Sequence, residues 1–407
     1  MSPFDDHIPL LKPWIDDDEL AEVEAVLRSG WVSQGPKVRE FEDRLAAWLA
    51  TPFAVATNSA TAALHLALVL AGLQRGDRVV VPASTCMATV NALFLAGGVP
   101  VFADIDARTF NMEPAYARAA LDDDVKGMLV VHQVGLAADL DGFRELASER
   151  GLFLVEDAAT ALGAKYRGRF LGSHGNLTVF SLHPRKMITT GEGGVLTLFH
   201  QDADERARRL RSAGASISDL QRHRALGRLK QDYAEPGFNY RLTDIQAAVG
   251  LAQLRKVERM LAERAGQAAS YDRRLSEVDE VCPPYVPPYA VHCYSSYCIT
   301  LPGARDDAIE QVLAHMADRG ISCRRGIGSL CREPYFERAC RNISLPNTDA
   351  VARQTMFLPI FPGLDERAQE RVVAALKEAI VKHLPHPIVS RAASASGGPQ
   401  DDGDEKW

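Results

Sequence analysis

The sequence has no long apolar stretch: in its 407 residues no run approaches the roughly 20 that a helix needs to cross a bilayer. The N-terminal segment MSPFDDHIPLLKPW lacks the charged start and apolar core of a secretory signal, so no membrane partner is expected. Basic charge is also scarce, because the formal net charge is −7 and generic nucleic-acid binding needs a basic face. These absences favour a cytoplasmic protein that binds neither nucleic acid nor membrane.

The sequence has few cysteines, and their spacing forms no recognisable motif. The seven cysteines are an odd number without a C-x-x-C pair, so we expect no disulfide framework and a reducing compartment. Cys323, Cys331 and Cys340 are irregularly spaced, whereas structural zinc sites use tight pairs, so we predict no metal. Hydrophobic residues at 46% and charged residues at 24% are ordinary for globular proteins, and the length suits two domains.

Strand-like and helix-like segments alternate through the first 200 residues. Helical patterns at Ser59–Gly72, Cys86–Gly97 and Asp139–Arg150 separate most of the apolar runs. This alternation predicts an α/β domain with a mostly parallel sheet covered by helices on both faces. The predicted strands are Phe53–Thr57, Arg78–Ala83, Val99–Ile105, Gly127–His132, Leu152–Ala158, Leu177–Leu182 and Gly193–Phe199.

The second half of the chain begins with one long helix, predicted from Leu242 to about Glu277. A Pro-rich stretch, Cys282–Pro288, follows it and indicates a domain junction. A strand at Tyr294–Leu301 and a helix at Asp306–Arg319 then predict a smaller α/β domain. Residues 386–407 are small, polar and acidic, so we expect a disordered tail.

The helix start after the first predicted strand is a candidate anion site. Asn58, Ser59, Ala60 and Thr61 place backbone N–H groups and hydroxyls at the positive end of a helix dipole. This arrangement suits a phosphate. N-capping by Asn58 or Ser59 explains the same residues, so this segment alone leaves both interpretations open.

A carboxylate and an amine follow two later strands. Asp157 ends an apolar strand, and ligands of open parallel sheets lie beyond such ends, where a carboxylate pairs with a pyridinium nitrogen, caps a helix or binds a metal. Lys186 lies between a strand and the turn TTGEGG. Desolvation and the nearby Arg185 would lower its proton affinity and make it nucleophilic, although a surface lysine beside a turn fits equally. The ordered set of cradle, carboxylate and amine is the stronger signal.

These motifs resemble one family. From about Ile8 to about Leu384 the sequence is similar to the DegT/DnrJ-type sugar aminotransferases, a branch of the fold-type I pyridoxal-phosphate (PLP) enzymes. The resemblance implies a large PLP-binding domain with a seven-stranded sheet and a smaller C-terminal α/β domain. We place them at 1–255, with an N-terminal arm, and 256–385. The matching segments are SGWVSQGPKVREFE, NSATAAL, GDRVVVPA, PVFADID, VEDAA, FSLHPRKMITTGEGGV, FNYRLTDIQAAVGLAQL and LPIFPGL.

The resemblance also implies roles for single residues. Lys186 should hold PLP as a Schiff base and move the proton during transfer, and Asp157 should face the pyridine nitrogen. Asn239 should reach the phosphate bound by a partner subunit, which implies a homodimer with a shared active site. The phosphate should otherwise be held by Ser59, Ala60, Thr61 and Ser181.

Three positions depart from the family pattern. Cys86 stands where relatives often carry an aromatic residue that stacks on the cofactor ring, and Thr160 stands where they carry Gln or His near its phenolic oxygen. Cys331 stands where His is common. His132 ends a strand and either lines the site or satisfies backbone groups. The predicted substrate contacts are His132, Arg241, Arg324, Arg325 and Cys331.

The implied reaction moves an amino group from L-glutamate to a keto-sugar, expected to be attached to a nucleoside diphosphate. Its product would enter polysaccharide or secondary-metabolite biosynthesis. Two alternatives stay open. A PLP-dependent sugar dehydratase uses the same scaffold, but such relatives carry His in place of Lys186. An aminotransferase for a cyclitol or another non-nucleotide ketone fits every motif.

Overall fold

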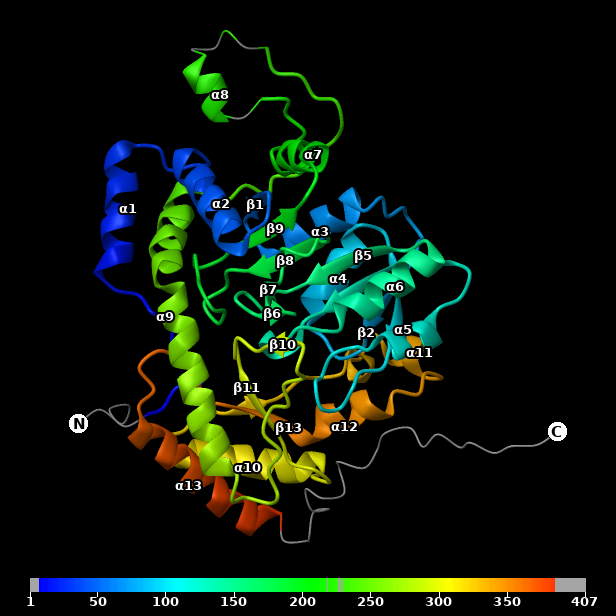
Figure 1. Ribbon diagram of the computed structural model, residues 1–407, viewed down its shortest axis with the longest axis vertical. Coiled ribbons are helices and arrows are strands. Elements are labelled where there is room, and N and C mark those ends of the chain that lie inside the picture. The colour runs from blue at the N-terminus through cyan, green and yellow to red at the C-terminus, as the bar shows by residue number, and fades with distance from the viewer. Residues whose placement is uncertain (1–6, 218, 226–227, 229, 385–407) are drawn as a thin grey trace, which may run out of the picture.

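The computed structural model describes residues 7–217, 219–225, 228 and 230–384 (Figure 1). The tail predicted at 386–407 lies outside these residues. None of the described helices is both long enough and apolar enough to span a membrane.

A seven-stranded sheet forms the centre of the upper part of the molecule in Figure 1, in the order β1-β9-β8-β5-β4-β2-β3. β9 runs antiparallel to both of its neighbours, β1 and β8, and the other pairs of adjacent strands are parallel. Every strand predicted in the first 200 residues enters this sheet, so the mostly parallel α/β fold is confirmed. The strands are β1 (Phe53–Thr57), β2 (Arg78–Pro82), β3 (Val99–Ala103), β4 (Val125–Val131), β5 (Phe153–Asp157), β8 (Leu177–Ser181) and β9 (Gly194–Leu198).

Helices cover both faces of this sheet, because alternate strand residues point to opposite sides. Val79 and Val81 pack in the apolar cluster with α3 and α4, whereas Val80 packs in the cluster with α6. The result is a three-layer αβα sandwich. The helices of this half are α1 (Asp17–Ser29), α2 (Pro36–Leu49), α3 (Ala60–Leu70), α4 (Met87–Leu95), α5 (Pro114–Ala120), α6 (Leu140–Arg150), α7 (Gln201–Arg211) and α8 (Asp219–Arg224), with a 3₁₀ turn η1 (Gln133–Gly135).

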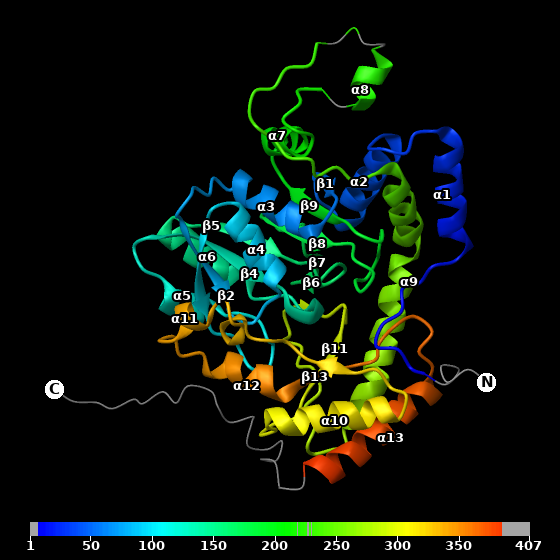
Figure 2. The same ribbon diagram turned by 180° about the vertical axis from the view of Figure 1, so that it is seen from behind.

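The long helix α9 (Asp244–Leu275) connects two apolar cores. Residues up to Met260 pack under the seven-stranded sheet, and those from Ala268 pack in a second core with a three-stranded sheet, α10 and α13 (Figure 2). The domain boundary predicted at residue 255 lies before the last contacts of the first core, because Val257 and Met260 still pack there, and it stays a proposal. The remaining elements are β11 (Tyr297–Thr300), α10 (Asp306–Asp318), β12 (Arg324–Arg325), η2 (Leu330–Arg332), α11 (Glu337–Cys340), α12 (Pro346–Gln354), β13 (Thr355–Leu358) and α13 (Glu366–His383).

A small sheet lies between the two cores, in the order β10-β6-β7. Its strands are β6 (Lys165–Tyr166), β7 (Arg169–Phe170) and β10 (Ala290–Val291). Because β10 follows the Pro-rich junction and β6 belongs to the first half, this sheet joins the two parts of the chain.

One expectation about cysteine is corrected. The structure pairs Cys331 with Cys340 in a disulfide, although no C-x-x-C spacing announced it. The two residues are nine positions apart and meet because η2 and α11 fold back on each other. Among the described residues no group of three or more His, Cys, Asp or Glu side chains is placed to hold a metal ion.

Candidate active site

Four strands bring the predicted site residues to one edge of the sheet. Thr57 pairs with Gly194, Gly194 pairs with Ser181, and Asp157 pairs with Val179 on the parallel neighbour. The helix start of the cradle, the strand-end carboxylate and the start of the lysine loop therefore lie at the same edge. This is the edge at which ligands of open α/β sheets bind.

Lys186 lies in a loop that is closed at its base. The Leu182 amide donates to the Gly193 carbonyl (2.9 Å), and the Thr190 amide donates to the Leu182 carbonyl (3.0 Å). Gln246 of α9 also donates to the Glu192 carbonyl (2.7 Å). These hydrogen bonds fix both ends of the loop, so the backbone that carries Lys186 has little freedom to move.

Asp157 is buried and held by two donors. The Thr89 hydroxyl donates to Oδ2 (2.8 Å) and the Ala159 amide donates to Oδ1 (3.0 Å). Burial raises the pKa of Asp157, and these hydrogen bonds together with the charge of Lys186 offset only part of that effect. The carboxyl thus sits where its proton can be shared with a basic nitrogen.

The start of α3 forms the predicted cradle. Ser59 caps the helix by accepting from the Ala62 amide (3.1 Å), and the amides of Ala60 and Thr61 make no backbone hydrogen bond within the described residues. Gly194 lies directly under this turn, because an added Cβ would come within 2.5 Å of the Ala60 nitrogen. Open amides at a helix N-terminus are suited to a phosphate.

Positive charge gathers around Lys186. Burial lowers the pKa of its amine; Asp157 and Cys86 oppose this shift, and Arg185 and Arg324 add to it. A lowered pKa increases the share of neutral, nucleophilic amine at neutral pH. The site therefore holds an amine, a facing carboxyl and an anion cradle, which together fit PLP: an aldehyde, a ring nitrogen and a phosphate.

Arg324 reaches this site through contacts between distant segments. Its guanidinium lies 5.5 Å from the centre of the Phe357 ring, across the β12–β13 pair. The following residues dock on the loop before Cys86, where the Leu330 amide donates to the Ala83 carbonyl (2.9 Å). The Ser84 hydroxyl donates to the Gly328 carbonyl (3.1 Å). The structure thus brings Cys86, Lys186 and Arg324 together.

His132 is completely buried and has both ring nitrogens engaged. The Ala138 amide donates to Nδ1 (3.0 Å), so Nε2 carries the proton and donates to Glu156 (2.9 Å). Thr160 donates its hydroxyl to the His132 carbonyl (2.9 Å). This geometry favours the interpretation that His132 satisfies buried polar groups over the interpretation that it lines the site. Any contact of Thr160 with the cofactor stays a prediction.

Two predicted substrate residues have other partners. Arg325 points to α10, where it binds Asp306 (3.1 Å) and Glu310 (2.5 Å), because neighbouring strand residues face opposite sides. Cys331 is bound to Cys340. Arg325 is thus held in ion pairs and Cys331 in a disulfide, and a substrate contact of either residue stays a prediction.

Asn239 and Arg241 lie beside the cradle. The Asn58 amide donates to the Tyr240 carbonyl (2.9 Å), and Arg241 forms an isolated bridge with Thr57. The Asn239 side chain is exposed and makes no hydrogen bond within the described residues, whereas its backbone carbonyl accepts from the Asn58 side chain (3.3 Å). Both side chains remain available for a ligand or a second subunit.

Sequence reasoning missed two supporting residues. Thr89, which donates to Asp157, is the last residue of PASTCMAT and carries no signal beyond its place near the start of a helix. Glu156 binds His132 and Asn176 on the side of the strand away from Asp157. An acidic pair at the end of a buried strand could have indicated that one member faces the site and the other the core.

The comparisons with known proteins agree with this site. A sequence profile of the DegT/DnrJ/EryC1/StrS aminotransferase family matches residues 13–377. The sugar aminotransferase CalS13 from Micromonospora echinospora is 30% identical, with a TM-score of 0.83 over 91% of this chain and 99% of its own.

Two further structures extend the comparison. Spr1654 of Streptococcus pneumoniae, solved in a PLP form, is 27% identical with a TM-score of 0.85 over 92% of this chain and 99% of its own. It has also been solved in a PMP form. 3-Amino-5-hydroxybenzoic acid synthase is 26% identical with a TM-score of 0.83, over 91% and 98%.

The profile covers most of the chain, the matched structures align over nearly their full lengths, and the edge of the sheet carries groups that fit PLP. The chain belongs to the DegT/DnrJ/EryC1/StrS aminotransferase family and is a PLP-dependent sugar aminotransferase.

Proposed function

We propose that this enzyme transfers the amino group of L-glutamate to a keto-sugar carried on a nucleoside diphosphate. The observation that carries the proposal is the half-buried amine of Lys186, which faces the buried carboxyl of Asp157 across a site with two arginines. A product of this kind would enter polysaccharide or secondary-metabolite biosynthesis.

The residues that would hold PLP come from four elements. Ser59, Ala60, Thr61 and Ser181 supply amides and hydroxyls for the phosphate at the start of α3 and the end of β8. When bound, the cofactor supplies an aldehyde and an electron sink. Asp157 would keep the ring nitrogen protonated, because a carboxylate buried beside that nitrogen stabilises its positive charge.

Lys186 would serve as both the attachment point and the base. Its lowered pKa leaves its amine free to take a proton from the α-carbon of the donor and return it to the acceptor. The closed loop from Leu182 to Gly193 would keep the amine at this position through both half-reactions. Cys86 would leave room beside the cofactor ring, at the position where relatives often carry an aromatic residue.

Anion recognition would fall to Arg185 and Arg324. Both guanidinium groups lie near Lys186, and within the described residues neither has a carboxylate partner. Burial and the charge of Arg185 lower the pKa of Arg324, so an arriving anion would relieve the repulsion between them. The two arginines suit the carboxylates of glutamate or a phosphate of the sugar nucleotide.

One alternative acceptor has support of its own. 3-Amino-5-hydroxybenzoic acid synthase matches this chain over 91% of its length, and its named product is not a sugar. A cyclitol or another non-nucleotide ketone therefore stays an alternative. A dehydratase is less favoured because Lys186 is present.

The substrate is tested with a panel of nucleotide-linked 3-keto and 4-keto sugars and one keto-cyclitol, each with L-glutamate. We expect the C=O of the acceptor to become CH–NH2, so the product should be heavier by the mass of NH3 less that of oxygen, seen by mass spectrometry, with a nucleotide-linked sugar only. Turnover of the cyclitol alone would contradict the nucleotide sugar and leave the aminotransferase intact.

The role of Lys186 is tested with Lys186→Ala. We expect turnover to be abolished and PLP to be held without a covalent bond, so borohydride should no longer fix the cofactor to the protein, as read by intact mass. Lys126→Ala, which removes an exposed lysine of β4, is the control, and borohydride should still fix PLP to this variant. Transamination at the wild-type rate by Lys186→Ala would refute the assignment.

The working unit is proposed to be a homodimer. Asn239 is exposed beside its own cradle, which suits a side chain that reaches the phosphate of a partner subunit. Arg241, two residues later, would bind an anionic group near the same boundary. The cytoplasmic location stays a prediction from the sequence.

A further inference from the structure

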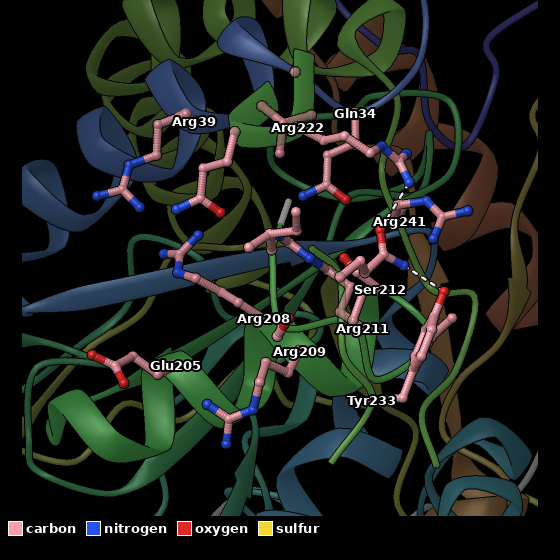
Figure 3. A pocket seen from close by; sticks show the side chains of 18 of the residues that line it. Gln34, Arg39, Glu205, Arg208, Arg209, Arg211, Ser212, Arg222, Tyr233 and Arg241 are labelled. Atoms are coloured by element: carbon pink, nitrogen blue, oxygen red, sulfur yellow. Dashed lines mark hydrogen bonds between the residues drawn. The ribbon is translucent and has the colours of Figure 1, made fainter. Parts of the chain in front are cut away.

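A second cavity lies outside the outer edge of the seven-stranded sheet, apart from Lys186. It has a volume of about 740 Å³, within the range of small-molecule sites, and lies between α2, the end of α7 and the segment around Tyr233 (Figure 3). Of the predicted site residues only Arg241 lines it. The proposed aminotransferase chemistry uses no other part of this cavity.

Six arginines and only two carboxylates line the cavity. The carboxylates are Glu42 and Glu205. Figure 3 shows the guanidinium groups around the hollow, with Arg39 on one side and Arg241 on the other. The arginines are Arg39, Arg208, Arg209, Arg211, Arg222 and Arg241.

Two of these arginines protect the edge strand β1 and share one acid. Arg208 donates to the Ala54 carbonyl (3.1 Å) and Arg211 donates to the Ala56 carbonyl (2.6 Å), which covers an otherwise open sheet edge. Both also bind the buried carboxylate of Glu42, and Asp204 supports Arg208. The Nε of Arg211 is buried and makes no hydrogen bond within the described residues.

Two of the other arginines are paired with acids that lie outside the cavity. Arg39 binds Asp43 on the exposed face of α2 (3.1 Å), and Arg209 lies 3.8 Å from Glu235. Arg241 has neither an ion pair nor a hydrogen bond to its guanidinium among the described residues. The cavity therefore keeps an excess of positive charge on planar donors, which match phosphate oxygens well.

We propose that this cavity is a second binding site, for an anion of phosphate type that carries two or more negative charges, such as a diphosphate. Its arginines would close on the anion from α2, α7 and the Arg241 segment. A ligand there would contact Arg241, which bridges to Thr57 at the end of β1. Binding of the anion would therefore affect the backbone next to the phosphate cradle at the start of α3.

The site is tested on the purified holoenzyme with inorganic pyrophosphate as the probe, by isothermal titration calorimetry at low ionic strength. The double variant Arg39→Gln/Arg209→Gln should weaken binding by at least about tenfold, because each change removes a charge-assisted contact. The matched control is Arg44→Gln/Arg206→Gln. Arg44 pairs with Glu40 on the same helix and Arg206 with the same Glu235, but neither lines the cavity.

Arg324→Gln separates this site from the one at Lys186 and should retain pyrophosphate affinity. Arg39→Glu adds a second test, because this side chain is 58% exposed and its charge reversal should weaken binding without affecting folding. Parallel titrations with UDP and with inorganic phosphate show which part of a ligand the cavity recognises. Equal affinity for UDP and pyrophosphate would mean that the cavity recognises the diphosphate alone. Tighter binding of UDP would mean that it also recognises the nucleoside. Absence of pyrophosphate binding, an equal loss in the matched control, or a loss in Arg324→Gln would overturn the proposal.

Discussion

At the scale of single residues, two adjacent carboxyls at the end of β5 have opposite surroundings. Asp157 faces Lys186 and has a raised pKa because it is buried. Burial would also raise the pKa of Glu156, but hydrogen bonds from His132 and Asn176 outweigh it and hold that pKa below its usual range. The strand alternation thus turns the two carboxyls to opposite sides, and we predict that Asp157 takes part in the reaction and that Glu156 stabilises the core.

This division predicts opposite effects for two substitutions. Asp157→Asn should keep the fold and bind PLP but lower kcat by at least about a hundredfold, because the ring nitrogen loses its acid partner. Glu156→Ala should leave His132 and Asn176 without an acceptor, cost about 2–4 kcal/mol and lower Tm by several degrees. Steady-state kinetics and thermal melts on both variants check this. A large loss of kcat at unchanged Tm for Glu156→Ala would contradict the division.

His292 predicts a pH dependence of stability. It is buried, accepts from the Tyr294 amide (2.8 Å) and stacks on that ring, and burial lowers its pKa to about 3. Because the unfolded chain regains a pKa of about 6.5, it binds more protons between these values, and stability falls as pH drops from 6.5 toward 3. The slope from this residue is at most about 1.4 kcal/mol per pH unit.

Thermal melts between pH 7 and pH 5 measure this effect. The Tm of His292→Asn should fall less over this range than that of the wild type, whereas a variant of the exposed His200, such as His200→Asn, should follow the wild type. Parallel curves for all three proteins would assign the acid sensitivity to other groups.

At the scale of elements, the start of α9 caps the start of α2. The carboxylate of Asp244 accepts from the amides of Gly35 (2.8 Å), Lys37 (3.0 Å) and Val38 (3.0 Å). Gly35 is required there, because an added Cβ would overlap the Trp31 indole. One buried carboxylate thus satisfies donors that the helix itself leaves open.

Asp244→Ala should therefore destabilise the protein by about 2–3 kcal/mol, since it leaves buried amides unsatisfied. Asp43→Ala, which removes an exposed carboxylate in the middle of α2, should change stability by less than about 0.5 kcal/mol. Denaturant midpoints of the two variants provide the comparison. An equal loss in both would mean that the cap contributes nothing.

Sequence patterns predicted the elements that depend on local order. The run at Phe53–Thr57 became β1 with the same bounds, and the helix from Leu242 became α9, two residues shorter at each end. The short strands β6, β10 and β12 were not predicted, because two-residue pairings carry no periodicity and depend on distant partners.

The same difference holds for the site. Asp157 and Lys186 were predicted as site residues because a strand end and a glycine-rich turn mark them in the sequence, and the structure brings them close enough to interact electrostatically. The approach of Arg324 and the diversion of Arg325 to α10 depend on how Gly328 and Leu330 dock on Ser84 and Ala83, which no local pattern encodes. Motifs therefore predict which groups react, and tertiary contacts decide which neighbours reach those groups.

At the scale of the whole molecule, the proposed dimer predicts complementation between two defective variants. Lys186→Ala removes the amine of its own site, whereas Asn239→Ala removes a side chain that we place in the site of the partner. In a mixed dimer both defects fall in one site and leave the other intact. Random mixing makes half of the dimers mixed, so refolded mixtures should regain up to about a quarter of wild-type activity.

The contrary geometry has a different outcome. If Asn239 serves the site of its own chain, each site of a mixed dimer carries one defect, and the mixture should show no more than the average activity of the two variants. The exposed side chain of Asn239, which makes no hydrogen bond within the described residues, favours the shared arrangement. Activity measured against the fraction of each variant in the mixture distinguishes the two, because only a shared site gives a maximum at equal amounts.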